Sequence, residues 1–169
     1  MGLNNIEDYV GYNDISDVKL QMASQSKDFS CGVSAMLAVL HHYNKKVSER
    51  ELFKRLECTP ENGVTPLKII EVAKYYGLKP EFKQLTTKDV QKLTDMDIPI
   101  ILMVQSRNRN YDYDDGHYIV AVGYDKEGIL VYDPLDDNKK TRIRYAELPN
   151  VWYDWMDGKM LRYYGIVVK

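Results

Sequence analysis

One stretch decides the fold of this chain: residues 25–40, which read QSKDFSCGVSAMLAVL. Its second half predicts a helix, because apolar residues from Val33 to Leu40 recur at the spacing of one helical face. Its first half predicts a loop that ends at Ser30, whose hydroxyl can accept hydrogen bonds from the amides of the first helical turn. We therefore expect a helix that begins at Cys31.

The position of Cys31 at a helix start favours a reactive thiol. Unpaired N–H groups and the helix dipole stabilise negative charge there, so a thiol ionises more easily, and the thiolate is the nucleophilic form. The alternative is that Cys31 is a small buried hydrophobe before an apolar helix. The segment by itself leaves both interpretations open, and residues about ninety positions further on distinguish them.

Length and composition indicate one globular domain over residues 1–169. The net charge of −2 gives no footprint for nucleic-acid binding. The longest apolar run, 98–104, has the length of a strand and not of a membrane span. Two cysteines, no metal-ligand spacing and no recognisable signal peptide indicate a reducing, cytoplasmic location without a metal or another cofactor.

Capping signals mark further helices in the first half of the chain. Ser48, Thr65 and Thr86 are each placed to cap a helix, and Pro66 is suited to the first helical position. Gly77 is expected to end the helix that Pro66 begins. The alternating pattern of residues 18–22 predicts a short strand before Cys31, and Cys58 is expected to be a structural residue in a loop.

The second half reads as strands. Their expected ranges are 98–105, 117–124, 129–133, 140–145 and 163–168. A hairpin turn around Gly128 joins the second and third of these. Helices first and strands later predict an α+β domain, in which N-terminal helices pack on a C-terminal antiparallel β-sheet.

Three residues from separate segments form a candidate catalytic set. The hairpin turn places His117 and Asp133 roughly opposite each other on paired strands, so their side chains can meet. A histidine held by a carboxylate at one ring nitrogen offers the other nitrogen to a thiol such as that of Cys31. Taken singly, His117 is better explained as a core histidine and Asp133 as a turn former; the ordered set favours catalysis.

The chain resembles the bacteriocin-processing (double-glycine leader) cysteine peptidase family, a branch of the papain-like superfamily. The resemblance covers residues 18–140, and the matching pieces are Gln25 six residues before Cys31, the Cys31-Gly32-Val33 helix start, Gly63-Val64-Thr65-Pro66-Leu67, Gly116-His117-Tyr118 and Val131-Tyr132-Asp133-Pro134. It implies a papain-like fold and a cysteine peptidase that acts on a peptide or protein substrate through a thioester.

The resemblance also implies the role of each site residue. Cys31 would be the nucleophile, His117 the general base, Asp133 the residue that orients His117, and Gln25 the oxyanion donor beside the Cys31 backbone N–H. Many family members carry an acidic residue directly before the cysteine, where this chain has Ser30. The best-known members are domains of membrane exporters, so an association with such an exporter stays open although this chain shows no membrane segment.

Two alternatives to a leader peptidase remain from sequence. One is a non-catalytic module that docks leader peptides, although such relatives typically lack the cysteine. The other is a papain-like amidase or acyltransferase that acts on a different amide. The segment 107–116 is interpreted as a solvated loop or a wall of the cleft and does not match a calcium loop. The tail, 145–169, has no place in the family pattern.

Overall fold

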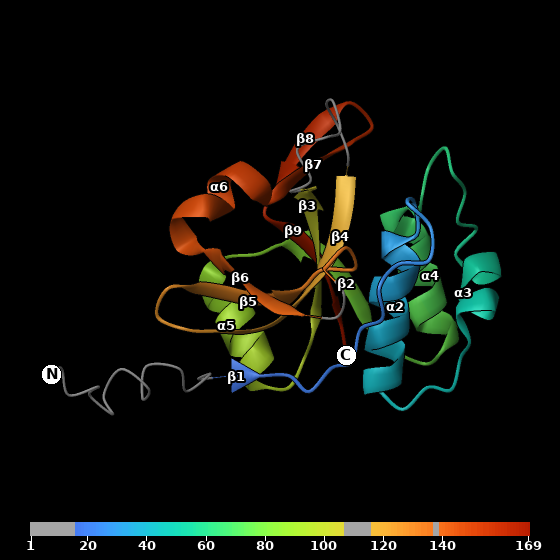
Figure 1. Ribbon diagram of the computed structural model, residues 1–169, viewed down its shortest axis with the longest axis horizontal. Coiled ribbons are helices and arrows are strands. Elements are labelled where there is room, and N and C mark those ends of the chain that lie inside the picture. Colours follow the sequence, from blue (N-terminus) through green and yellow to red (C-terminus); the bar gives the residue numbers. More distant parts are fainter. Residues whose placement is uncertain (1–15, 107–115, 137–138) are drawn as a thin grey trace, which may run out of the picture.

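The computed structural model describes residues 16–106, 116–136 and 139–169, and an antiparallel sheet lies at its centre (Figure 1). The strand order is β2-β9-β3-β4-β5-β6, and β1 also pairs with β4. The strands are β1 (Ser16–Asp17), β2 (Pro80–Gln84), β3 (Ile100–Gln105), β4 (Gly116–Tyr124), β5 (Gly128–Tyr132), β6 (Lys140–Arg144) and β9 (Tyr164–Val168). The five strands predicted in the second half are therefore present.

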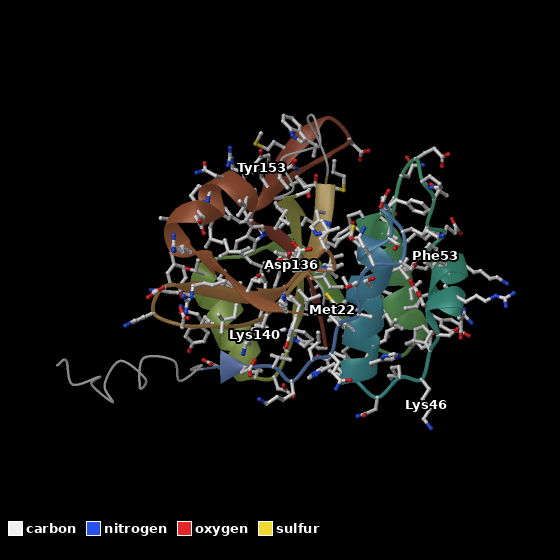
Figure 2. All side chains as sticks on the ribbon, viewed as in Figure 1. Met22, Lys46, Phe53, Asp136, Lys140 and Tyr153 are labelled. Carbon is white, nitrogen blue, oxygen red and sulfur yellow. The ribbon has the colours of Figure 1, made fainter. Side chains whose placement is uncertain are left out.

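Helices cover both faces of this sheet (Figure 1). On one face lie α2 (Cys31–His42), α3 (Glu49–Arg55) and α4 (Pro66–Tyr75); on the other lie α5 (Thr87–Asp95), η1 (Tyr145–Glu147) and α6 (Leu148–Val151). Each face has its own apolar cluster, and Met22, labelled in Figure 2, belongs to the one beneath α2. The α+β class and the papain-like arrangement expected from sequence are confirmed.

The predicted capping residues start three of the helices. The hydroxyl of Ser48 accepts from Glu51 N, that of Thr65 from Lys68 N, and that of Thr86 from Asp89 N. Gly77, with φ of +79°, follows α4 in the left-handed region that favours glycine. Local sequence therefore fixes these helix ends.

Ser30 does not cap α2, so this detail of the prediction is wrong. It occupies the N-cap position, but its side chain makes no capping hydrogen bond. Its hydroxyl instead donates to Lys27 O at 3.0 Å and accepts from Lys27 N at 3.0 Å. The buried Ser30 thus closes the loop before the helix, and no serine hydroxyl occupies the amides at the start of α2.

The strand predicted over residues 18–22 is also wrong. Val18, Leu20 and Met22 are buried, and the residues between them are exposed, so the alternation was read correctly. However, β1 ends at Asp17, and Val18 N donates to Val122 O at 2.7 Å beyond that strand end. Alternating burial without a ladder of hydrogen bonds makes this an extended segment.

The tail completes the sheet. Its final strand, β9, lies between β2 and β3 in the interior of the sheet. Before it, β7 (Tyr153–Met156) and β8 (Lys159–Arg162) form a separate hairpin, whose turn residues Asp157 and Gly158 both have positive φ. Figure 1 shows this hairpin at the end of the molecule where β4 begins. The residues 107–115, which belong to the predicted loop, lie outside the described part of the chain.

No helix among the described residues is long and apolar enough to cross a membrane.

Candidate active site

The start of α2 and the start of β4 lie at the same end of the molecule (Figure 1). Glycine at position 32 makes this approach sterically possible, since a Cβ there would lie 2.8 Å from Val64 Cβ and 3.1 Å from the ring of Tyr118. The Tyr118 hydroxyl donates to Val64 O at 3.0 Å and ties the loop before α4 to the sheet. The helix start that carries Cys31 is therefore packed directly against β4, next to His117.

His117 and Asp133 meet, as the hairpin register suggested. His117 Nε2 donates to Asp133 Oδ1 at 2.6 Å, and the two residues are only 5% and 7% exposed. Val120 of β4 pairs with Tyr132, the last residue of β5. His117, near the start of β4, therefore lies close to Asp133, which directly follows β5. A short, buried hydrogen bond of this kind fixes the orientation of the imidazole ring.

Asp133 is itself held in place by the backbone that follows it. Its Oδ1 also accepts from Leu135 N at 2.9 Å, and Pro134 O accepts from Gln25 N at 3.0 Å. The second contact joins the loop after β5 to the loop that leads into α2. The loop that holds Gln25 and leads to Cys31 is thus connected by a backbone hydrogen bond to the segment of Asp133, which is far from it in sequence.

The environment of His117 favours its protonated form. Burial lowers the pKa of this imidazole, but the hydrogen bonds to Asp133 and to the Cys31 side chain, together with the negative charge of both, raise it to about 10. Because Nε2 is taken by Asp133, the ring nitrogen left for Cys31 is Nδ1. The arrangement therefore favours an imidazolium that faces the Cys31 side chain.

The start of α2 also offers backbone donors. The first amides of a helix have no intrahelical acceptor, and here the N-cap side chain does not occupy them. The half-buried Cys31 lies at the first position of the helix. Its N–H is therefore placed to stabilise negative charge that develops on a carbonyl oxygen attacked by its own sulfur.

Gln25 lines the same cleft, but its amide is already engaged. Its Nε2 donates to Lys27 O at 2.8 Å and to Asp28 O at 2.9 Å, which uses both hydrogens. Its Oε1 is buried and has no hydrogen-bond partner among the described residues. A donor role toward substrate would require the amide to exchange one of these carbonyls for the oxyanion.

Cys58 lies close enough to Cys31 to interact with it electrostatically, yet its surroundings differ. Its Sγ donates to Phe29 O at 3.6 Å, and it is half-buried. Burial, and to a lesser extent the charge of Cys31, raises the pKa of the Cys58 thiol to about 11. Cys58 is therefore a protonated thiol at neutral pH.

A cleft with a volume of about 770 Å³ opens around these residues. Its lining includes Gln25, Cys31 and His117, and the loop before α4 forms part of its wall. The described residues contain no group of three or more His, Cys, Asp or Glu side chains that could hold a metal ion. The cleft brings together a thiol and an imidazole.

The β7–β8 hairpin forms another wall of the cleft, which was not anticipated from sequence. Asp154, Trp155, Met156 and Asp157 all line it. Gln105 Nε2 donates to Tyr153 O at 3.4 Å and to Asp154 Oδ1 at 3.3 Å, so β7 is attached to the end of β3. The Asp157-Gly158 pair is a sequence signal for a tight hairpin turn, and this element could have been found from it.

The sequence matches the model of the peptidase C39 family over residues 19–156. A relative is the mesentericin Y105 transport/processing ATP-binding protein MesD of Leuconostoc mesenteroides, 27% identical over 136 residues. The match covers 79% of this chain but only 18% of that protein's length. The comparison therefore concerns one segment of the relative.

Solved structures give the same fold. One is a double-glycine motif protease from an AMS/PCAT transporter in complex with the leader peptide. It superposes with a TM-score of 0.68 and 19% sequence identity, and the match covers 92% of this chain and 94% of that one. The peptidase domain of Streptococcus ComA, a bifunctional ABC transporter, also has a TM-score of 0.68, with 22% identity and 88% and 96% covered. At this identity the likeness establishes the fold.

Proposed function

The chain belongs to the peptidase C39 family, and on that premise we propose that it is a cysteine peptidase whose catalytic residues are Cys31, His117 and Asp133. The observation that carries the proposal is the buried His117–Asp133 hydrogen bond of 2.6 Å, with the other side of the imidazole against Cys31 at the start of α2. A histidine that only filled the core would not need a cysteine on one side and a carboxylate on the other.

The first half of the reaction uses the thiolate and the imidazolium. Cys31 Sγ attacks the carbonyl carbon of the scissile amide, and the carbonyl oxygen becomes an oxyanion near the Cys31 N–H. As the C–N bond breaks, His117 Nδ1 gives its proton to the leaving amine. A thioester between Cys31 and the N-terminal part of the substrate remains.

The second half regenerates the enzyme. His117, now neutral, takes a proton from water, and the resulting hydroxide attacks the thioester carbonyl. The C–S bond breaks, the acid product leaves, and Cys31 is again a thiolate beside the imidazolium. Asp133 keeps its hydrogen bond to Nε2 throughout and stabilises the ring whenever it carries the extra proton. Together with the one water molecule that is consumed, these side chains balance the atoms and charge of the reaction.

The relatives indicate the substrate that we propose first. One solved neighbour is a double-glycine motif protease bound to a leader peptide, and the curated relative is a transport and processing protein. We therefore propose a peptide with a leader that ends in Gly-Gly, cleaved after the second glycine, and an association with a membrane exporter on its cytoplasmic side.

Mass spectrometry of synthetic precursors tests both levels of the proposal. Peptides with a Gly-Gly leader end, and matched peptides with Ala-Ala there, are incubated with the protein, and products and acid-quenched protein are weighed. We expect cleavage after Gly-Gly and a transient acyl adduct on Cys31. Cleavage of other peptides only would overturn the leader specificity, and binding without products or adduct would assign a docking module instead.

A further inference from the structure

Tyr118 lies where three parts of the candidate site meet. It directly follows His117 on β4, and it is 7% exposed. Its ring borders Gly32, the residue after Cys31, because a Cβ on that glycine would lie 3.1 Å from the ring. Its hydroxyl donates to Val64 O at 3.0 Å. One side chain therefore contacts both the helix start that carries Cys31 and the loop that precedes α4.

The loop of residues 59–65, which we call the cleft loop, is held together by hydrogen bonds of its own. Thr59 N donates to Gly63 O at 3.1 Å, and Gly63 N donates to Thr59 O at 2.7 Å. Asn62 N also donates to Thr59 Oγ1 at 3.2 Å. Gly63 has φ of +57°, which glycine adopts without strain. These local bonds fix the shape of the cleft loop but not its position relative to α2.

The cleft loop forms a wall of the cleft beside the candidate nucleophile. Residues 60–65 all line the cleft together with Cys31. At the end of the loop, the Tyr118 hydroxyl holds Val64 O. Just before its start, Cys58 Sγ donates to Phe29 O at 3.6 Å, and a thiol is a weak donor. Of these two attachments, the hydrogen bond from Tyr118 is the stronger.

Packing explains the ring of Tyr118 but not its hydroxyl. A phenylalanine ring would fill the same space against Gly32 without a buried polar atom that needs a partner. Proton transfer does not explain the hydroxyl either. Burial above all, and then the negative charges of Cys31 and Asp154, raise the pKa of Tyr118 well above its usual value. The hydroxyl therefore keeps its proton at neutral pH and remains a donor to Val64 O.

We propose that Tyr118 is a positioning residue of the peptidase. Its hydroxyl holds the cleft loop at a fixed place beside Cys31, so that the part of the substrate that becomes the thioester is aligned with the attacking sulfur. The inference rests on the proposed peptidase function, because it concerns how the same cleft binds its substrate. Tyr118 acts through the cleft loop and not on the reacting atoms. Loss of its hydroxyl therefore weakens the binding of extended peptides and spares the reactivity of the thiol.

Hydrogen exchange tests whether the hydroxyl anchors the cleft loop. Tyr118→Phe removes the hydroxyl and keeps the ring. Tyr43→Phe is the matched control, because the Tyr43 hydroxyl also donates to a main-chain oxygen, Val168 O at 2.7 Å, and Tyr43 lies at the other end of α2, outside the cleft lining. We expect the amides of residues 58–65 to exchange about fivefold faster in Tyr118→Phe alone, the factor for one hydrogen bond. Equal acceleration in both variants, or none in either, would overturn the proposal.

Peptidyl chloromethyl ketones test the alignment without turnover, because the Cys31 sulfur displaces chloride from them and forms a stable thioether. The rate of this reaction is measured by mass spectrometry with acetyl-Gly and acetyl-Ala-Ala-Gly-Gly chloromethyl ketones, and with iodoacetamide as a reagent too small to contact the wall. We expect the long ketone to react faster than the short one in the native protein and in Tyr43→Phe. Tyr118→Phe should lose about fivefold of this advantage and keep its iodoacetamide rate. No advantage in the native protein, or a full advantage in Tyr118→Phe, would overturn the proposal.

Steady-state kinetics on a cleaved peptide separate positioning from stability. Tyr118→Phe should raise KM about fivefold and leave kcat almost unchanged, because the wall contributes to binding, whereas Tyr43→Phe should leave KM unchanged. Lower melting temperatures in both variants with no change in KM would assign Tyr118 a structural role and overturn the proposal. If no peptide is cleaved but the advantage of the long ketone still depends on Tyr118, the peptidase function fails and the positioning of bound peptides by Tyr118 stands.

Discussion

The two cysteines of this chain are both half-buried and unpaired, yet their surroundings differ in every respect that matters for reactivity. Cys31 begins a helix and faces the protonated form of His117. Cys58 lies in a loop, donates to the carbonyl of Phe29, and has its pKa raised to about 11 by burial. The comparison teaches that position on a helix and a charged neighbour, not exposure, separate a candidate nucleophile from a structural thiol.

The largest expected effect on turnover comes from removing the thiol of Cys31, compared with removing that of Cys58. Cys31→Ala should abolish turnover, whereas Cys58→Ala should leave kcat within about twofold, since Cys58 does not line the cleft and its protonated thiol takes no part in the reaction. His117→Gln should be as severe as Cys31→Ala, because nucleophile and base act as a unit. The kcat of each variant is measured on a precursor peptide that the protein cleaves, and its melting temperature serves as the folding control. Equal losses of kcat for the two cysteine variants would contradict the distinction between the two thiols.

His117→Gln is preferred to His117→Ala because it retains a donor for Asp133. Removing the imidazole altogether would take from the buried carboxylate its 2.6 Å hydrogen bond, and the loss of a bond to a buried charge costs stability in addition to activity.

A smaller effect is expected from Gln25, whose amide lies at the cleft with both hydrogens bonded to backbone carbonyls. If one hydrogen turns to the oxyanion during reaction, Gln25→Ala should lower kcat by about 10²–10³ with little change in KM. Gln25→Glu is the matched variant, because it keeps the size and replaces the donor by an acceptor. A pure KM effect in both variants would assign Gln25 to substrate binding or loop structure.

Asp133→Asn should sharpen the comparison by altering protonation more than structure. The amide keeps an oxygen for Leu135 N, but the negative charge beside His117 is lost. The pKa of His117, raised to about 10 in the native protein, should therefore fall, and the imidazolium should deprotonate at lower pH. NMR titration of the imidazole measures this change. An unaltered titration curve would mean that Asp133 orients the ring without stabilising its charge.

Much of the framework could be predicted from local chemistry. Caps at Ser48, Thr65 and Thr86 and the left-handed Gly77 mark helix ends because their interactions lie within one helical turn. The pairing of His117 with Asp133 followed from a hairpin between neighbouring strands. These features depend on residues close in sequence or on a single turn, so few other local structures fit the same residues.

Other features depend on distant contacts and were not predicted. The polar strand β2, PEFKQ, is half-exposed. Among the described strands it pairs with β9 alone, which lies about eighty residues further on and in the interior of the sheet. The position of the β7–β8 hairpin beside His117 depends on Gln105 and on the space above Gly116. The failure of Ser30 to cap α2 depends on its competing bonds to Lys27, a choice that residue type alone does not determine.

The measurement that tests the account most directly is competitive labelling of the two thiols. The folded protein is treated with iodoacetamide at intervals from pH 5 to 8, and the adducts on Cys31 and Cys58 are quantified by mass spectrometry. We expect Cys31 to react first and to stay reactive at the acid end, and His117→Gln to move its labelling to higher pH, while Cys58 stays slow throughout. Similar rates for both cysteines, each rising only toward alkaline pH, would contradict an activated Cys31.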